Sequence, residues 1–210
     1  MANDYSKILF LCSPNNPSGN SFDPIQMESL IRQFKGLVVI DEAYIDFSEQ
    51  QSWLQRLEEF PNLVVTQTLS KAYGLAGIRL GICYASSEII SILNKIKPPY
   101  NVNELTQQKT MERLLKQNEV KKEIQNIKQQ RDLMIEKLQS VDLISKIYPT
   151  DANFILVKVD DASKRYEQLI KQGIVVRNRT NEPLCHNCLR LTVGIPSEND
   201  ILIKTIKKIA

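Results

Sequence analysis

A lysine, two hydroxyl side chains and an arginine lie close together in the segment Thr68-Leu-Ser-Lys-Ala-Tyr-Gly-Leu-Ala-Gly-Ile-Arg79. This segment follows the apolar run Leu63-Val-Val65, which predicts a buried strand that begins after the turn signal Pro61-Asn62. A lysine at the carboxyl end of such a strand lies where open α/β sheets bind ligands. Partial removal from water there would favour the neutral amine of Lys71, which is a nucleophile toward carbonyl groups.

Anion donors surround this lysine in the sequence. Thr68 and Ser70 offer hydroxyl groups and Arg79 offers a guanidinium, so the segment predicts a small anion site. A nucleophilic lysine beside a phosphate clamp is what a pyridoxal 5'-phosphate (PLP) enzyme requires. A solvated loop that happens to contain a Ser-Lys pair is the alternative, so further support must come from the rest of the chain.

Two earlier strands are also predicted to end on polar residues. The run Lys7–Cys12 predicts a strand buried on both faces, and it leads into a Pro- and Asn-rich turn that contains Asn16. The amide of Asn16 could donate to a ring oxygen or a carboxylate, although a plain strand-to-helix loop would have the same spacing. The run Leu37–Ile40 predicts a second buried strand, which ends at Asp41.

The carboxylate of Asp41 needs a partner, because an unpaired charge at the end of a buried strand is costly. A protonated pyridine nitrogen would be a suitable partner, and Tyr44, three residues later, could hydrogen-bond a ring hydroxyl. Capping of the next helix, or pairing with a lysine, is the alternative for Asp41.

Helical stretches separate these strands. Asp23 and Pro24 predict the start of a helix over Ile25–Phe34, and Trp53–Phe60 has the pattern of an amphipathic helix. Alternating strands and helices predict an α/β fold with a mostly parallel sheet, in which polar residues at successive strand ends converge on one crevice.

The second half of the chain has a different pattern. One or two long amphipathic helices are predicted between Asn103 and Ser140, and shorter strands and helices follow. We therefore predict a large domain over 1–138, which includes a long interdomain helix, and a small α+β domain over 139–210. Arg177 and Arg190 lie at or beside predicted strand ends, where their guanidinium groups could bind carboxylate or phosphate. Either arginine alone is more often a surface charge.

Composition restricts the class of protein. The chain has 210 residues, 42% of them hydrophobic and 24% charged, with a formal net charge of only +3, so there is no case for nucleic-acid binding. We expect a cytoplasmic protein, since no apolar run reaches membrane-spanning length. Cys185 and Cys188 have metal-like spacing around the single histidine, His186, but a second ligand pair is absent, so no metal site is predicted.

With these segments in place, the chain resembles the fold-type I PLP-dependent aminotransferases and, more narrowly, the histidinol-phosphate aminotransferase family. The resemblance covers nearly the whole chain in the expected order. It is carried by Ser13-Pro-Asn-Asn-Pro-Ser-Gly19, Val39-Ile-Asp-Glu-Ala-Tyr44, Thr68 to Gly81, Val176-Arg177, and Cys188-Leu-Arg-Leu-Thr-Val-Gly194.

The resemblance implies a role for each candidate residue. Lys71 would bind PLP covalently and then act as general base and acid, and Asp41 would keep the pyridine nitrogen protonated. The remaining implied roles are contact with the ring hydroxyl (Asn16, Tyr44), binding of the cofactor phosphate (Thr68, Ser70, Arg79), and binding of the substrate carboxylate (Arg190) and the substrate phosphate (Arg177).

The implied reaction is amino transfer between L-histidinol phosphate and 2-oxoglutarate, giving glutamate, by a homodimer in L-histidine biosynthesis. Family members carry a sizeable segment before the strand at Lys7, so we expect a C-terminal portion with an incomplete sheet that binds PLP weakly or not at all. The alternatives are an aromatic aminotransferase, an amino-acid phosphate decarboxylase of the same fold, and a non-catalytic interaction fragment.

Overall fold

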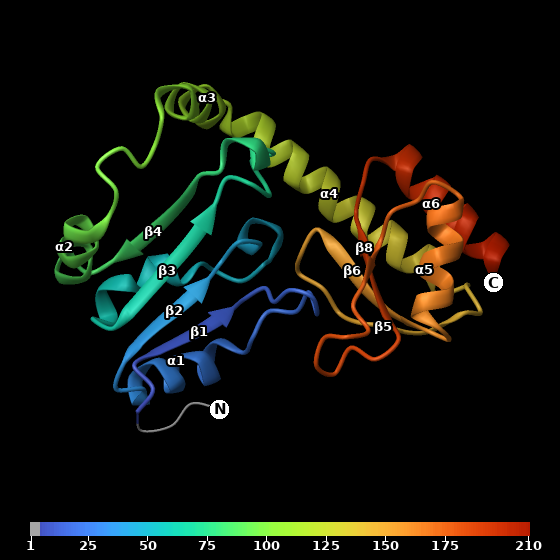
Figure 1. The fold of residues 1–210 in the computed structure, drawn as a ribbon, viewed down its shortest axis with the longest axis horizontal. Helices are drawn as coiled ribbons and strands as arrows, with labels where there is room; N and C mark the ends of the chain where they lie inside the picture. The colour runs from blue at the N-terminus through green and yellow to red at the C-terminus, as the bar shows by residue number, and fades with distance from the viewer. Residues whose placement is uncertain (1–4) are drawn as a thin grey trace. The chain divides into compact units, whose positions relative to one another are not determined.

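The computed structural model describes residues 5–210, which divide into two compact units (Figure 1). The first unit contains the described residues up to Pro14 together with Ser21–Lys122, and the second contains Asn15–Asn20 and Glu123–Ala210. This division falls inside the long helix α4 (Gln117–Leu138), whose last turns pack into the core of the second unit. The domain boundary at 138/139 stays a prediction.

The first unit is built on a four-stranded sheet with strand order β1-β2-β3-β4. The strands β1 (Ile8–Cys12), β2 (Leu37–Asp41) and β3 (Leu63–Thr68) are parallel, and β4 (Gly81–Ala85) runs antiparallel to β3. The expected parallel arrangement of the first three strands is therefore confirmed. The helices of this unit are α1 (Pro24–Gln33), α2 (Ser87–Ile96), α3 (Glu104–Leu114) and the beginning of α4, with short 3-10 helices η1 (Ile45–Phe47), η2 (Trp53–Glu59) and η3 (Ala76–Ile78).

The prediction that the first strand is buried on both faces is wrong. Ile8 is 51% exposed and Phe10 is 72% exposed, whereas Val38 and Ile40 of β2 are fully buried. The reason is the position of β1, which within residues 5–210 pairs only with β2 and so forms an edge of the sheet. A continuous apolar run does not distinguish a central strand from an edge strand.

The second unit is an α+β arrangement around an antiparallel sheet with strand order β5-β6-β8-β7. Apolar side chains from the end of α4, from the sheet and from helices α5 and α6 form its core, which includes Met134, Leu138, Ile155, Leu169 and Leu191. The elements are β5 (Ile144–Ile147), β6 (Phe154–Val159), α5 (Ala162–Lys171), β7 (Arg177–Asn178), β8 (Cys188–Thr192) and α6 (Pro196–Ile209).

The apolar run Ile174-Val-Val176 forms no strand, because β7 covers only Arg177 and Asn178. The backbone N–H of Ile174 donates to the carbonyl of Leu169 (2.9 Å), so this part of the apolar run ends helix α5 instead of joining the sheet. Gly173 supports the turn with a positive φ of 76°.

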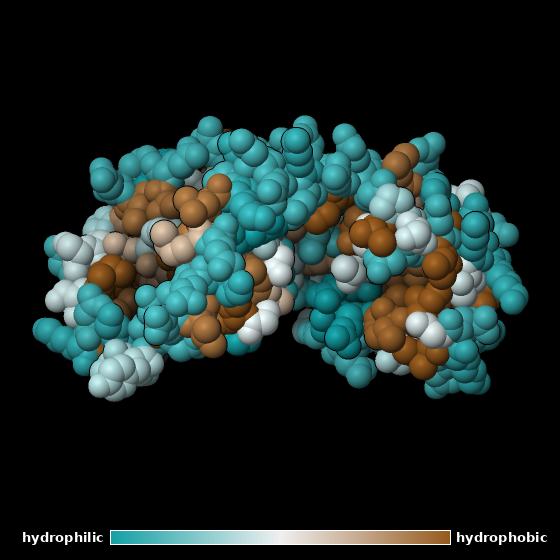
Figure 2. Space-filling model, turned by 90° about the horizontal axis from the view of Figure 1, so that it is seen from above, coloured by the Kyte–Doolittle hydropathy of each residue, from teal (hydrophilic) through white to brown (hydrophobic). Residues whose placement is uncertain are grey.

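Large apolar side chains are exposed in both units, and Figure 2 shows them as brown patches among hydrophilic residues. In the first unit they gather on α2, on α3 and on the segment between these helices. The exposed residues there are Ile92, Leu93, Ile96, Tyr100, Leu105, Met111 and Leu115. Such a group is larger than scattered surface hydrophobics and is typical of a surface that contacts another protein chain.

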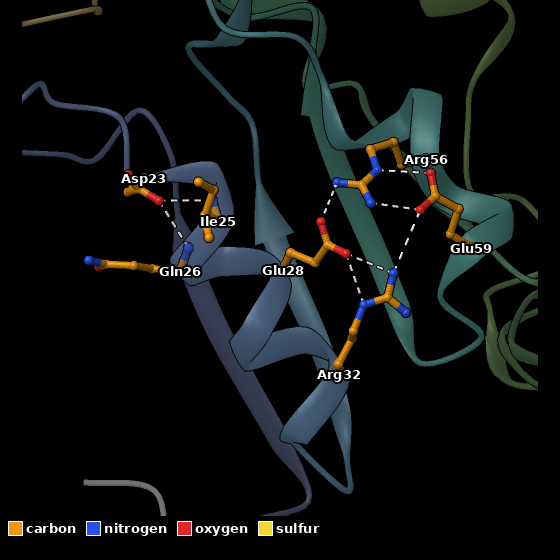
Figure 3. A network of polar contacts seen from close by, with 7 residues as sticks. All are labelled: Asp23, Ile25, Gln26, Glu28, Arg32, Arg56 and Glu59. Carbon is orange, nitrogen blue, oxygen red and sulfur yellow. Dashed lines mark hydrogen bonds and ion pairs between the residues drawn. The ribbon is translucent and has the colours of Figure 1, made fainter.

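The start of helix α1 is as predicted. The carboxylate of Asp23 accepts hydrogen bonds from the backbone N–H groups of Ile25 (2.8 Å) and Gln26 (3.0 Å), and Pro24 occupies the first turn (Figure 3).

The stretch after β2 forms a 3-10 helix, η2, instead of the α-helix that its amphipathic pattern suggested. Its ends are held by aromatic packing, with the rings of Trp53 and Phe60 6.1 Å apart in an edge-on arrangement. Arg56 of η2 also pairs with Glu28 of α1 (2.8 Å) and with Glu59 (2.6 Å), as Figure 3 shows. These contacts favour a compact, tightly wound segment against α1.

Candidate functional site

Lys71 lies just beyond the end of β3, in a turn closed by a hydrogen bond from the Gly74 N–H to the Lys71 carbonyl (3.0 Å). Its ammonium nitrogen is 5.3 Å from the centre of the Tyr44 ring, within the range of a cation–π contact. The structure therefore brings the ends of β2 and β3 together at these two side chains. The expected partial burial of Lys71 is wrong, because its neighbours Leu69 and Ala72 are the buried residues of this turn and Lys71 is exposed.

Thr68 and Ser70 form part of the same turn. The Thr68 hydroxyl accepts a hydrogen bond from the Ser70 N–H (3.1 Å) and donates to the Leu80 carbonyl (3.3 Å). Arg79 follows η3 with a left-handed backbone (φ 55°), which is uncommon for a residue other than glycine and is often found at functional sites. Its guanidinium donates to the Ala76 carbonyl (2.9 Å), and within residues 5–210 no hydrogen bond joins it to Thr68 or Ser70.

Asp41 is the last residue of β2 and pairs in register with Thr66 of β3. Its Oδ1 accepts a hydrogen bond from the Ala43 N–H (3.1 Å), so the carboxylate shapes the local turn that leads to Tyr44. Among residues 5–210 it forms no ion pair with a lysine or arginine. Its second oxygen is therefore able to accept from a ligand.

Glu42 is a residue of this region that sequence reasoning missed. It is 1% exposed, and its carboxylate accepts hydrogen bonds from Ser52 Oγ (2.5 Å), the Trp53 N–H (2.7 Å) and Gln67 Nε2 (2.9 Å). Burial raises the pKa of Glu42, while the hydrogen bonds from Ser52, Gln67 and Trp53 act in the opposite direction. The signal in the sequence was a second acidic residue directly after a buried strand.

The second unit contains the other three candidate residues. Arg190 of β8 donates to the side-chain carbonyl of Asn16 (2.6 Å), and its guanidinium carbon lies 4.8 Å from the centre of the Phe154 ring. Arg177 of β7 is exposed and stands directly opposite Arg190 in the antiparallel register. Opposed residues share one face of a sheet, so the side chains of both arginines leave β7 and β8 on the same face. The crevice that would join Asn16 to the residues of the first unit stays a prediction.

Residues 5–210 contain no group of three or more His, Cys, Asp or Glu side chains placed to hold a metal ion. The same residues contain no helix that is long and apolar enough to cross a membrane. Cys185 and Cys188 are buried thiols that pack with Leu156, and burial raises the pKa of Cys185.

Comparison with solved structures identifies the fold. The structure superposes on the histidinol-phosphate aminotransferase of Clostridium acetobutylicum with a TM-score of 0.91 at 23% identity, over 97% of this chain and 64% of that one. It also superposes on the histidinol-phosphate aminotransferase of Sinorhizobium meliloti in complex with pyridoxal-5'-phosphate, with a TM-score of 0.85 at 22% identity over 98% of this chain and 59% of that one. The fold is that of the fold-type I PLP-dependent aminotransferases, as predicted.

Sequence comparison gives the family. A histidinol-phosphate aminotransferase of Flavobacterium johnsoniae is 64% identical over 202 residues, which are 96% of this chain and 58% of that protein. The chain thus spans somewhat more than half the length of this curated relative. The family model for aminotransferase class I and II matches residues 2–206. The chain therefore belongs to the class I and II aminotransferase family.

Proposed function

We propose that this chain carries PLP- and substrate-binding residues of a histidinol-phosphate aminotransferase, which transfers an amino group between L-histidinol phosphate and 2-oxoglutarate in L-histidine biosynthesis. The observation that carries the proposal is the exposed amine of Lys71 beside Tyr44, at the adjoining ends of two parallel strands in a class I and II aminotransferase chain. The 64% identity to a relative of that name supports the choice of substrate.

The donor set of the first unit fits PLP. A phosphorylated pyridine aldehyde needs a primary amine, an acidic partner for its ring nitrogen, and hydroxyl or guanidinium donors for its phosphate. Lys71 supplies an accessible amine, and Asp41 supplies a carboxylate at the end of the neighbouring strand. The phosphate donors in our proposal are Thr68, Ser70 and Arg79, of which Arg79 would exchange its bond to the Ala76 carbonyl for a bond to the ligand.

Each residue has a chemical task in this proposal. When bound, PLP would supply the electron sink that makes the amine-bearing carbon of the substrate acidic. The Lys71 Nζ would take up the proton of that carbon and hold it for return, and a lysine with an accessible amine is suited to both roles. The Tyr44 ring keeps the amine close to this position, and Asp41 holds a proton on the pyridine nitrogen.

The arginines of the second unit would bind the anionic groups of the substrates. Arg190 is oriented by Asn16 and by the ring of Phe154, so its guanidinium is held in place for bidentate contact with a carboxylate. Arg177, opposite Arg190 on the same face, would bind the substrate phosphate, and an anion between the two would relieve the repulsion of their charges.

We also propose that the protein works as a cytoplasmic homodimer. The exposed apolar side chains on α2, α3 and the segment between them support a subunit interface on the first unit. Sedimentation velocity of the purified chain tests this: a dimer is expected, and a monomer at tens of micromolar would contradict the proposal.

The first experiment is an absorbance titration of the purified chain with PLP, followed by borohydride reduction and peptide mass spectrometry. Because we expect weak PLP binding, the titration extends to excess PLP, where the proposal requires a visible band whose formation depends on Lys71, with the label found on Lys71. Lys71→Ala should abolish the band, and the control Lys95→Ala, which removes another exposed lysine of the same unit, should not. Equal bands in the wild type and Lys71→Ala would refute the assignment of Lys71.

Assays of aminotransferase activity then identify the amino donor. The chain is assayed for glutamate formation from 2-oxoglutarate with L-histidinol phosphate or with aromatic amino acids as the donor. Turnover that is faster with L-histidinol phosphate supports the proposal, and turnover only with aromatic donors would replace it with an aromatic aminotransferase.

A further inference from the structure

The buried carboxylate of Glu42 holds together the two ends of the loop that follows β2. Glu42 directly follows β2, and its side chain binds Ser52 and Trp53, which begin the 3-10 helix η2. Both ends of the loop between Glu42 and Ser52 are therefore held at one residue. This loop contains Tyr44, whose ring faces the amine of Lys71.

The same carboxylate also reaches the neighbouring strand. Gln67 Nε2 donates to Glu42 Oε2 (2.9 Å) and contacts Ser52 Oγ (3.2 Å), so the side chain of β3 and the start of η2 meet at Glu42. Gln67 lies one residue before Thr68, the hydroxyl that shapes the Lys71 turn. Glu42 thus connects the strand end that carries Tyr44 with the strand end that carries Lys71.

Neighbouring side chains of a strand point to opposite faces of the sheet. Asp41 and Thr66 are paired in register, so Asp41 and Thr68 share one face while Glu42 and Gln67 lie toward the other. The hydrogen-bonded group of Glu42, Ser52, Trp53 and Gln67, here called the Glu42 network, therefore lies toward the face of the sheet opposite to Asp41 and Thr68. Its side chains do not contact a ligand bound on the Asp41 face. Ser52, Trp53 and Gln67 all act as donors, an arrangement suited to an ionised carboxylate.

We propose that Glu42 is a positioning residue, which holds the Tyr44 loop against the end of β3 and thereby sets the position and reactivity of the Lys71 amine. Only the effect of Glu42 on PLP binding and catalysis rests on the proposed function. The position of Lys71 is a property of the chain itself and can be measured without PLP.

The test replaces one carboxylate oxygen with an amide. In Glu42→Gln the new amide N–H group faces donors of the network, and at least one buried donor loses its acceptor. The reciprocal variant Glu42→Gln/Gln67→Glu exchanges the two side chains and gives every donor an acceptor again. Glu58→Gln, an exposed position of the same 3-10 helix, is the matched control.

Three measurements follow the network and the amine separately. Trp53 is the single tryptophan of the chain, so acrylamide quenching of its fluorescence reports on the network directly. Competitive labelling with an amine reagent and mass spectrometry gives the reactivity of Lys71 in the absence of PLP, and absorbance titration gives the apparent PLP affinity. Circular dichroism confirms that each variant is folded at the temperature used.

We expect Glu42→Gln to increase Trp53 quenching, to change the Lys71 labelling rate by about threefold and to weaken PLP binding by about tenfold. The reciprocal variant should restore all three values, and Glu58→Gln should leave them unchanged. Increased Trp53 quenching with unchanged Lys71 labelling would overturn the proposal, because Glu42 would then be structural only. If the wild type forms no band with PLP, the proposed function fails, but the labelling comparison still decides the role of Glu42.

Discussion

Removal of the Arg165 guanidinium is expected to weaken the second unit measurably. The side chain of Arg165 on α5 is only 8% exposed, and its guanidinium binds both carboxylate oxygens of Asp160 (2.9 and 2.6 Å). It also donates to the carbonyl of Ile209 at the end of α6 and to Gln168. Arg165→Met keeps an apolar stem of similar length and removes the charge and all of these hydrogen bonds.

The expected loss of stability follows from the exposure of each partner. Asp160 is 47% exposed, so water can replace much of its lost contact, and the pair contributes about 1 kcal/mol. The hydrogen bond to the Ile209 carbonyl adds about 1 kcal/mol. We therefore expect a total loss of about 2 kcal/mol and a fall in thermal midpoint of about 4–8 °C.

This loss depends on pH in a defined direction. The hydrogen bonds from Arg165 lower the pKa of Asp160 from 3.8 to about 2. A carboxyl group whose pKa is depressed in the folded state stabilises the fold above its unfolded pKa and loses this contribution as the pH falls through the folded pKa. The difference between the wild type and Arg165→Met should be constant above pH 5 and shrink below pH 4.

Urea unfolding followed by far-ultraviolet circular dichroism measures the difference at pH 7, 5 and 3, and hydrogen exchange locates it in α5 and α6. Lys164→Met, an exposed substitution on the same helix, is the control. The reasoning is refuted if Arg165→Met costs no more than Lys164→Met at pH 7, or if the difference does not decrease at pH 3.

Two further predictions concern the second unit. Gly19→Ala should lower the free energy of unfolding, measured in urea, by about 2 kcal/mol, because Gly19 has a φ of 84° and an added Cβ would overlap with Thr150 Oγ1. The control Gly77→Ala, with open space around the added Cβ, should be nearly neutral. Equal losses in the two variants would contradict this prediction. Inorganic phosphate at ten times its dissociation constant should raise the thermal midpoint of the wild type by about 4 °C and that of Arg177→Gln by much less, with sodium chloride of equal ionic strength as the control. An equal rise in both proteins would exclude Arg177 from the anion site.

Much of the fold could be predicted from local sequence patterns. Asp23 and Pro24 predict the start of α1 from local capping alone, and the short Val-rich apolar runs in β2 and β3 predict strands. The exposure of Phe10 could not be predicted in this way, because it depends on which strands lie beside β1.

For the candidate site, too, the sequence predicts some features and not others. Asp41 and Lys71 could be selected as candidates because a charge at or just after the end of a buried strand is costly without a partner. Arg190 was expected at or beside a strand end, but it lies in the middle of β8. Their surroundings could not be inferred from spacing. The exposure of Lys71 depends on the turn that buries its neighbours Leu69 and Ala72, and the opposition of Arg177 and Arg190 depends on the register of two strands separated by a loop.

The alternation of side chains along a strand explains why Glu42 escaped notice and why it matters. In Asp-Glu-Ala-Tyr the acidic pair looks like one feature, but consecutive positions at the end of a strand face opposite sides of the sheet. Gln67 and Thr68 divide in the same way on the next strand, so each strand end gives one polar side chain to the candidate site and one to the network behind it. A ligand site at the end of a parallel sheet needs both, since the residues that touch the ligand lie where the buried layer holds them.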